Sequence, residues 1–261
     1  MPSLQAVVPF AAAFAVAYAL LCGWMYVTQR SQMYFPTPDS TAAPARAWWI
    51  ENSGERIKVW VVPRAGPSAL LYFGGNAEDV AGSVQPLLEA LPEHSLYLVN
   101  YRGYGGSTGQ PTETALRADA LAVFDEVRRR HAVLSVMGRS RGSGVAVQLA
   151  SARPVERLVL VTGFDSLANV AAAHFPWLPV RLLMKDRYES ARLAPDVSAP
   201  VLMVIAGHDE IIPRARSDAL ASAFRGGQAE VVVLPGVGHN TLDLSPQYLR
   251  SVRRFMAPSS D

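Results

Sequence analysis

The sequence has little cysteine and almost no net charge. Cys22 is the single cysteine among 261 residues, which excludes a disulfide framework, a thiolate zinc site and a catalytic thiol in the body of the chain. The 24 basic residues nearly balance the 22 acidic ones, and a net charge of +2 argues against a dedicated nucleic-acid binder. Apolar residues reach 50%, so the chain is not disordered and can form one large hydrophobic core.

The usual signatures of cofactor and metal sites are also missing. No G-x-G-x-x-G or G-x-x-x-x-G-K-[ST] pattern is present, so nothing suggests a dinucleotide site or a P-loop. The H-E-x-x-H spacing of a zinc protease is absent as well. We therefore expect chemistry that needs neither a cofactor nor a metal.

The first 29 residues carry no charged side chain. Leu4 to Val27 is a 24-residue apolar run that only Gln5, Pro9 and Gly23 interrupt. At about 1.5 Å per residue, a helix of this length reaches roughly 36 Å, more than the ~30 Å hydrocarbon core of a bilayer. Residues 1–29 are therefore expected to form a single membrane-spanning anchor, which makes the lipid bilayer a partner.

A cleaved signal peptide and a buried core helix are the alternatives for this segment. A signal peptide needs a basic n-region, a shorter apolar stretch and a small-x-small cleavage site, and none of these is clear here. A lipoprotein signal at Cys22 is disfavoured because Leu21 stands where a small residue is expected. Arg30 is the nearest charge, so the side of the membrane on which the domain lies is not predicted.

The rest of the chain alternates short β-branched runs with amphipathic stretches. After a Pro-rich linker at 30–45, this alternation predicts one α/β domain over 46–261, with a mostly parallel sheet and helices on both faces. Asn52-Ser53-Gly54 predicts a hairpin, so the first two strands should be antiparallel. Eight strands are expected, at 47–51, 57–62, 69–73, 95–100, 134–137, 158–161, 201–205 and 230–234.

Helices are expected between these strands, and one insert breaks the pattern. Residues 164–199 contain several prolines within an apolar stretch, which indicates a short cap over the sheet edge. The cap carries Phe175, Trp177 and Leu182, which could line an acyl site or touch lipid, or simply pack on the sheet. The expected helices lie at 78–90, 113–131, 141–152, 214–224 and 242–256.

Two segments match the G-x-S-x-G pattern of a serine nucleophile. Ser140 lies in Gly138–Gly142, directly after an apolar strand and at the start of a helix of small residues. Ser107 lies in Gly105–Gly109, in a glycine-rich loop that Pro111 follows. Because a nucleophile elbow is a strand-to-helix turn, the context favours Ser140 over Ser107.

A serine nucleophile needs a base and an acid that orients the base. His239 is the histidine that follows the last strand, in a loop with glycines. Asp209 follows the preceding strand, and the order Ser140, Asp209, His239 is the order in α/β-hydrolases. Glu210 and Asp165 remain as alternative acids, and either could instead cap a helix.

The remaining histidines are weaker candidates for the base. His94 and His131 precede strands, at the wrong end of the sheet, and His174 lies in the cap, where we expect it to pack.

The loop after the third strand is the candidate oxyanion hole. It reads Phe73-Gly74-Gly75-Asn76, and glycines let backbone N–H groups approach a substrate closely. We expect the backbone N–H groups of Asn76 and Arg141 to be the two donors. The alternative is a simple turn in which Asn76 caps the next helix, and the two roles are compatible.

With these motifs the chain resembles an α/β-hydrolase, and more narrowly the membrane-anchored bud-emergence type, similar to animal depalmitoylases and lysophospholipid lipases. The motifs are Gln29-Arg30-Ser31, Tyr34-Phe35-Pro36, Gly75-Asn76-Ala77, Asn100 to Gly105, Gly138-Arg139-Ser140 and Gly207-His208-Asp209. The resemblance implies the same nucleophile, base, acid and oxyanion donors.

The chain departs from that family at two positions. Members usually have His at the position of Gly74 and an aliphatic residue at that of Arg141. The Arg141 guanidinium could favour substrates with a phosphate or a carboxylate, or it could point to solvent or to an acidic neighbour.

We therefore expect a serine hydrolase that cleaves an ester or thioester, with an acyl chain at a membrane as the substrate. A membrane-tethered binding or scaffold protein with little turnover, and a serine peptidase on the same triad, are the alternatives.

Overall fold

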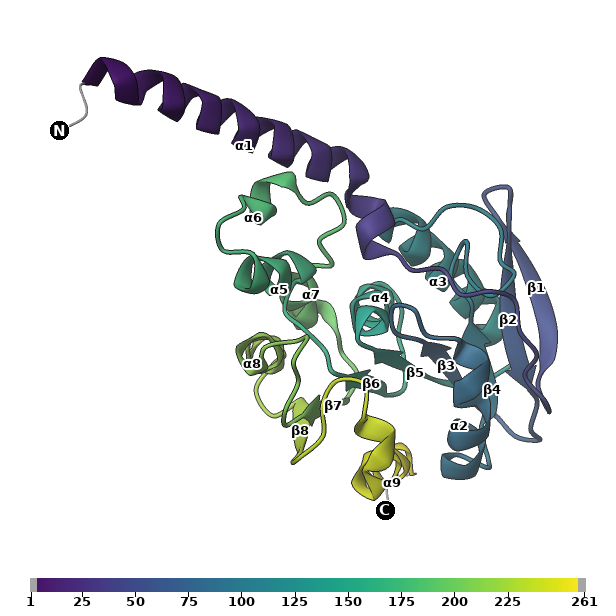
Figure 1. Ribbon diagram of the computed structural model, residues 1–261. Coiled ribbons are helices and arrows are strands. Elements are labelled where there is room, and N and C mark those ends of the chain that lie inside the picture. The colour runs from purple at the N-terminus through teal and green to yellow at the C-terminus, as the bar shows by residue number, and fades with distance from the viewer. Residues whose placement is uncertain (1–3, 258–261) are drawn as a thin grey trace.

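An eight-stranded sheet runs through the domain in the computed structural model, which describes residues 4–257 (Figure 1). The strands are β1 (Arg46–Asn52), β2 (Glu55–Val62), β3 (Ser68–Phe73), β4 (Ser95–Val99), β5 (Val133–Arg139), β6 (Leu158–Val161), β7 (Val201–Ala206) and β8 (Ala229–Leu234).

The order of the strands across the sheet is β1-β2-β4-β3-β5-β6-β7-β8. Strand β2 runs antiparallel to β1 and to β4, and the other neighbouring pairs are parallel. The prediction of a mostly parallel sheet that opens with an antiparallel hairpin is therefore confirmed. All residues of β4, β6 and β7 are buried, as in parallel sheets that are covered on both faces.

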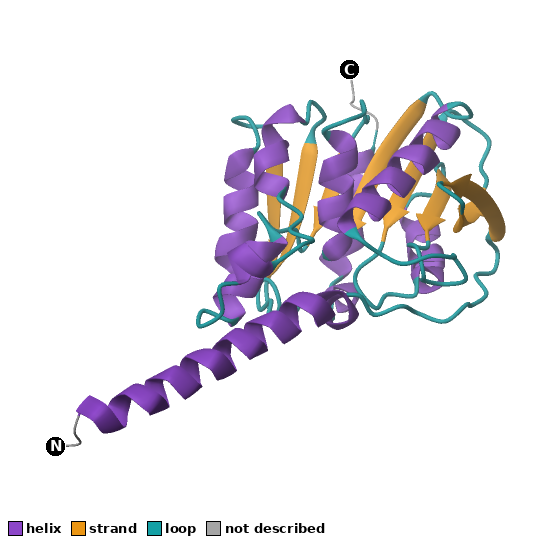
Figure 2. Cartoon of the chain, turned by 90° about the horizontal axis from the view of Figure 1, so that it is seen from above, coloured by secondary structure: helices purple, strands orange, loops and turns teal. Residues whose placement is uncertain are grey.

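Helices cover both faces of this sheet, also as predicted (Figure 2). Helix α3 begins after Thr112, whose hydroxyl accepts a hydrogen bond from the Ala115 N–H, 3.1 Å away. Five apolar positions of α3 face the core because they recur with the helical period. Helices α3 (Glu113–Arg128), α4 (Arg141–Ala150) and α8 (Arg214–Ala223) pack on one face, and α2 (Val84–Ala90) and α9 (Pro246–Met256) pack on the other.

The insert between β6 and β7 forms short helices rather than one long one. They are α5 (Leu167–His174), α6 (Val180–Leu183), α7 (Ser190–Leu193) and a 3-10 turn at Ala194–Asp196. The insert lies beside α1 (Leu4–Met33), where the Tyr18 hydroxyl donates to the Trp177 carbonyl at 2.7 Å (Figure 1). The insert therefore packs against the N-terminal helix.

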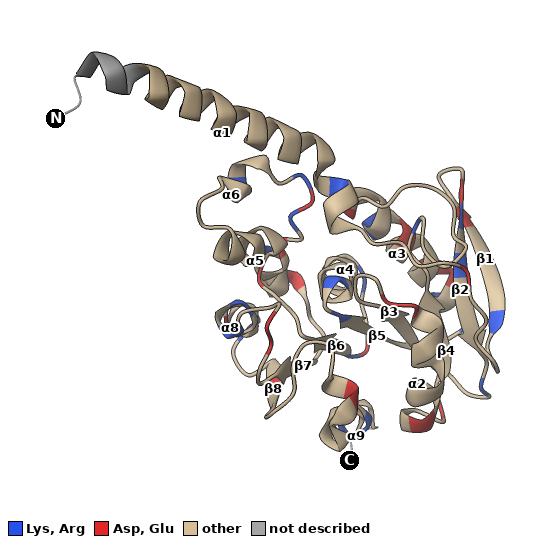
Figure 3. Ribbon diagram, in the orientation of Figure 1, with Lys and Arg blue, Asp and Glu red and all other residues tan. Residues whose placement is uncertain are grey.

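Helix α1 projects from the domain (Figure 2). Most of its large apolar side chains between Phe10 and Val27 are exposed. It ends at Met33, four residues beyond the boundary expected from the charge pattern. Figure 3 shows no charged residue along its described part before Arg30, near its end. Among residues 4–257 it is the one helix long and apolar enough to cross a membrane, over Pro9–Met33 with a mean hydropathy of 1.8.

The segment after α1 returns directly to the domain. Tyr34 and Ala42 are buried, although residues 34–45 form no helix or strand. The Tyr34 hydroxyl lies 3.0 Å from the Tyr188 hydroxyl and donates to Asp186 at 3.2 Å. The part of the predicted linker that follows the helix is therefore packed against the rest of the molecule.

Candidate active site

Ser140 lies at the tight turn between β5 and α4. Its φ of 52° and ψ of −117° are strained for a residue with a side chain, as expected for a nucleophile elbow. A Cβ at Gly138 would lie 2.8 Å from the Ala146 Cβ, and one at Gly142 would lie 2.7 Å from the Gly74 carbonyl oxygen. The flanking residues are therefore glycines because the helix passes so close to the strands.

The structure brings Ser140, His239 and Asp209 into one chain of hydrogen bonds. The Ser140 Oγ lies 2.9 Å from the His239 Nε2, and the His239 Nδ1 lies 2.9 and 3.0 Å from the two carboxylate oxygens of Asp209. The carboxylate also accepts the N–H groups of Ile211 and Ile212, at 2.9 and 2.7 Å. These two bonds fix the carboxylate, which in turn can orient the imidazole.

The alternative acids do not take this position. The Glu210 carboxylate accepts the backbone N–H of His239 at 3.1 Å, so it supports the loop and not the imidazole. Asp165 pairs with Arg216 at 3.1 Å and accepts the amide of Asn169. The Glu210 and Asp165 carboxylates therefore hold neighbouring segments together and do not contact the imidazole of His239.

The second G-x-S-x-G serine is engaged elsewhere. The Ser107 hydroxyl donates to the Asn100 carbonyl at 2.9 Å and accepts the N–H of Lys58 at 2.8 Å. These bonds tie the glycine-rich loop to β2. A tied hydroxyl with no histidine bonded to it lacks the geometry of an activated nucleophile.

Two other histidines also have local partners. The His131 Nε2 lies 2.9 Å from the Tyr97 hydroxyl, and burial lowers the pKa of His131. The His174 Nε2 lies 2.8 Å from the Ile211 carbonyl, so this ring links the cap to the loop after β7.

The loop after β3 lies against Ser140. A Cβ at Gly75 would lie 3.6 Å from the Ser140 Cβ, which shows how closely this backbone approaches. The Tyr101 hydroxyl donates to the Gly74 carbonyl at 2.7 Å, and the Gly75 N–H donates to Glu78 at 2.7 Å. These bonds fix the loop, and among the described residues no hydrogen bond uses the backbone N–H of Asn76.

Asn76 is not the cap of the next helix, contrary to the alternative considered for it. Asp79 caps the 3-10 helix Val80–Ser83, because its carboxylate accepts the N–H of Ala81. The Asn76 side chain instead donates to the Met33 carbonyl at 2.9 Å.

Glu78 and Val80 fill the space beside Gly74. A Cβ at Gly74 would lie 2.6 Å from the Val80 Cγ1 and 3.1 Å from the Glu78 Cδ. A histidine, the residue that the family resemblance implies here, would therefore displace both side chains.

The Arg141 side chain points neither toward the substrate cavity nor toward solvent or an acidic neighbour, the two arrangements expected from the sequence. It is buried, donates a hydrogen bond to the Met33 carbonyl, and places its guanidinium carbon 4.2 Å from the centre of the Tyr34 ring. It therefore faces the end of α1, not solvent, an acidic neighbour or the cavity at Ser140. Its backbone N–H begins α4, next to Ser140.

A cavity of about 520 Å³ opens at Ser140. Its lining includes Ser140, His239, Asn76, Phe35 and Ile211. Sequence reasoning missed the last two, since Phe35 lies in the predicted linker and Ile211 has no polar group to mark it. This volume is ample for the reacting part of an acyl ester.

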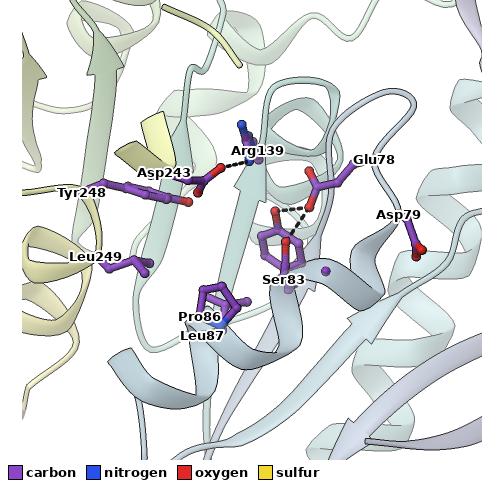
Figure 4. Close-up of a pocket in the computed structure, with 11 residues that line it drawn as sticks. Glu78, Asp79, Ser83, Pro86, Leu87, Arg139, Asp243, Tyr248 and Leu249 are labelled. Atoms are coloured by element: carbon purple, nitrogen blue, oxygen red, sulfur yellow. Dashed lines mark hydrogen bonds and ion pairs between the residues drawn. The ribbon is translucent and has the colours of Figure 1, made fainter. Parts of the chain in front are cut away.

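A smaller pocket of about 220 Å³ shares Arg139 and Glu78 with this cavity (Figure 4). The Arg139 guanidinium pairs with Asp243 at 3.2 Å and donates to the His239 carbonyl at 3.5 Å. Glu78 accepts the hydroxyls of Tyr72 and Ser83, at 2.7 and 2.8 Å. Arg139 therefore braces the loop that carries the imidazole, a contact across 100 residues that no local sequence pattern indicates.

Among residues 4–257, no group of three or more His, Cys, Asp or Glu side chains is placed to hold a metal ion.

Comparisons with known proteins extend this picture. The chain is 36% identical to the uncharacterized protein Rv2307c of Mycobacterium tuberculosis, over 97% of this chain and 95% of that protein. It is 31% identical to the alpha/beta hydrolase domain-containing protein aho-3 of Caenorhabditis elegans, over 72% of this chain and 57% of that protein. No family model matches the chain.

A solved structure shows the same fold. The esterase Pf2001 of Pyrococcus furiosus superposes with a TM-score of 0.69 at 14% identity, over 85% of this chain and 97% of that one. The order of the eight strands, the strained turn at Ser140 and the alpha/beta hydrolase relative all indicate the same superfamily. The chain therefore belongs to the α/β-hydrolase superfamily.

Proposed function

We propose that this hydrolase is a serine enzyme that cleaves carboxylic esters or thioesters through an acyl-enzyme. The observation that carries the proposal is the line of hydrogen bonds from the Ser140 Oγ through His239 to Asp209, in which Ser140 and His239 line a cavity of about 520 Å³. The hydrolase relatives support the general reaction, and the geometry supports these three residues for it.

In the proposed reaction, the Ser140 Oγ attacks the carbonyl carbon while the His239 Nε2 takes its proton. Asp209 holds the Nδ1–H and stabilises the imidazolium. The carbonyl oxygen becomes an oxyanion and accepts the backbone N–H groups of Asn76 and Arg141. His239 then protonates the leaving alkoxide or thiolate, and a water molecule, activated by the same imidazole, releases the acid and restores the serine.

The proposed substrate is an acyl chain presented at a membrane. Helix α1 exposes apolar side chains between Phe10 and Val27, and the cap beside it exposes Phe175, Trp177 and Leu182. An apolar groove of about 220 Å³ lies between α1 and the cap, with Met25, Met33, Phe175, Leu178 and Leu183 in its lining. These surfaces support a membrane anchor and a lipid-like substrate, because exposed apolar area is costly in water.

Labelling with a fluorophosphonate probe tests the chemistry. We expect the full-length protein in detergent to label, Ser140→Ala to lose the label, and Ser107→Ala, the matched control, to keep it. Turnover should fall by about 10³-fold or more in Ser140→Ala and His239→Ala. Equal labelling of the wild type and Ser140→Ala would refute the assignment, and an unlabelled wild type would favour a binding or scaffold role.

Substrate preference is tested separately with the same full-length protein. With the protein reconstituted in the same vesicles as the lipid substrate, we expect faster hydrolysis of long-chain acyl esters and thioesters than of short soluble esters at equal concentration. A strong preference for short soluble esters would refute the membrane substrate, and faster cleavage of peptides would indicate a peptidase.

A further inference from the structure

The last carbonyl of helix α1 is held by the two residues that carry the proposed oxyanion donors. The Met33 carbonyl ends the helix and has no partner within it. It accepts the Asn76 Nδ2 at 2.9 Å and a second hydrogen bond from the Arg141 guanidinium. The two side chains therefore converge on one oxygen atom, while Asn76 lines the same cavity as Ser140 and Arg141 directly follows Ser140 in the chain.

The next residues of the chain strengthen this junction. The Phe35 N–H donates to the Asn76 Oδ1 at 3.2 Å, and the Tyr104 hydroxyl donates to the same oxygen at 3.0 Å. The Asn76 amide is thus hydrogen-bonded through both its nitrogen and its oxygen. Phe35 also lines the cavity, so the exit from α1 forms part of the cavity wall.

The electrostatics of Arg141 make this contact strong. A helix carries partial negative charge at its C-terminal end, where a cation is favourable. The guanidinium is buried against the Tyr34 ring, and its Nε and Nη1 have no hydrogen-bond partner among residues 4–257. The Met33 carbonyl is therefore the hydrogen-bond acceptor that fixes the direction of this side chain.

The helix end is itself clamped to the cap. Arg30 donates two hydrogen bonds to the buried carboxylate of Asp186, at 2.9 and 3.1 Å. Gln29 donates to the Leu183 carbonyl at 3.1 Å and accepts the Lys185 N–H at 2.7 Å. These contacts fix where the Met33 carbonyl lies, although none of them touches the cavity at Ser140.

We propose that the side chains of Asn76 and Arg141 are positioning groups, which hold the oxyanion donors in place by binding the Met33 carbonyl at the end of α1. Helix α1 is then part of the catalytic apparatus and not only an anchor. The proposal rests on the proposed function, since it needs an oxyanion to form. A donor displaced by about 1 Å can cost about 100-fold in rate, so a small shift of the helix end is enough to matter.

The test uses full-length protein in detergent micelles with a short soluble ester. Fluorophosphonate titration gives kcat per reactive serine, so loss of folded protein does not enter the result. We expect Arg141→Leu to lower kcat about 10- to 100-fold with KM within about threefold. Arg30→Met, which lies outside the cavity, should lower kcat by about threefold or more. Ser31→Ala on the same turn should not, because the Ser31 hydroxyl bonds only to the Thr28 carbonyl among residues 4–257.

Inhibition by a trifluoromethyl ketone separates a positioning role from a merely structural one, which would leave the inhibition constant Ki unchanged. The ketone forms a tetrahedral oxyanion on the serine, so its Ki should rise in Arg141→Leu by the same factor by which kcat/KM falls. If Arg141→Leu does not fold, kcat and Ki of Arg30→Met decide whether the inference holds. If the wild type is active and the variants keep kcat and Ki within twofold of its values, this inference alone is overturned. If the wild type is inactive and unlabelled, the inference and the proposed function are both overturned.

Discussion

Gly142 offers a quantitative test of the elbow geometry. In Gly142→Ala the new methyl group would lie 2.7 Å from the carbonyl oxygen of Gly74, and closer still to that of Phe73. Both atoms belong to the backbone, so no side chain can rotate away. The contact to Gly74 alone requires a separation of about 0.8 Å to reach an ordinary ~3.5 Å, and the closer contact to Phe73 requires more.

This separation should cost both stability and rate. Overpacking of a closed core typically costs about 1–3 kcal/mol. In a domain of this size each kcal/mol lowers the Tm by about 2–4 °C, so a fall of about 2–12 °C is expected. Because the displaced segment leads into the loop of Asn76, kcat should fall by about 10- to 100-fold.

Gly82→Ala is the matched control, because a Cβ at that glycine would meet no atom within 4 Å. Thermal melts followed by circular dichroism, and ester hydrolysis per labelled serine, give the two quantities. If Gly142→Ala matches Gly82→Ala in both, the close packing of α4 on β3 does not constrain the site.

Three further results are expected. Asp209→Asn should lower kcat by about 10⁴-fold in the ester assay, because the amide favours the wrong tautomer of His239; a loss under tenfold would contradict this. Arg141→Leu should slow anionic and neutral esters by the same factor, because its guanidinium faces Met33; unequal factors would show that it meets the substrate. Burial lowers the pKa of His131 below 6.5, so the unfolded chain binds a proton at a higher pH than the folded protein does. The stability of the fold therefore falls as the pH drops through 6.5. His131→Gln should therefore flatten the Tm between about pH 7.5 and 5, and an unchanged slope would contradict it.

The fold could be predicted because its signals are local. Buried parallel strands are continuous apolar runs, and the turn Asn52-Ser53-Gly54 marks the hairpin by itself. The candidate site could be predicted from the loops after β5, β7 and β8, since parallel strands bring their carboxyl ends to one edge.

The rest depends on contacts between distant segments. Asn76 and Met33 are 43 positions apart, and Arg141 and Met33 are 108 apart, so no local pattern shows that these side chains meet one carbonyl. The same holds for Phe35, which the sequence places in a linker and the structure places in the cavity wall. Tertiary packing, and not backbone propensity, decides these positions.

Helix α1 is unbroken from Leu4 to Met33, and the chain enters the domain without a free spacer. With α1 across a bilayer, as proposed, the cavity stays at a fixed height and the enzyme searches in two dimensions. Its rate should then follow the mole fraction of substrate in its own membrane rather than the bulk concentration. Surface dilution with inert lipid would slow such an enzyme, whereas substrate in separate vesicles would remain out of reach.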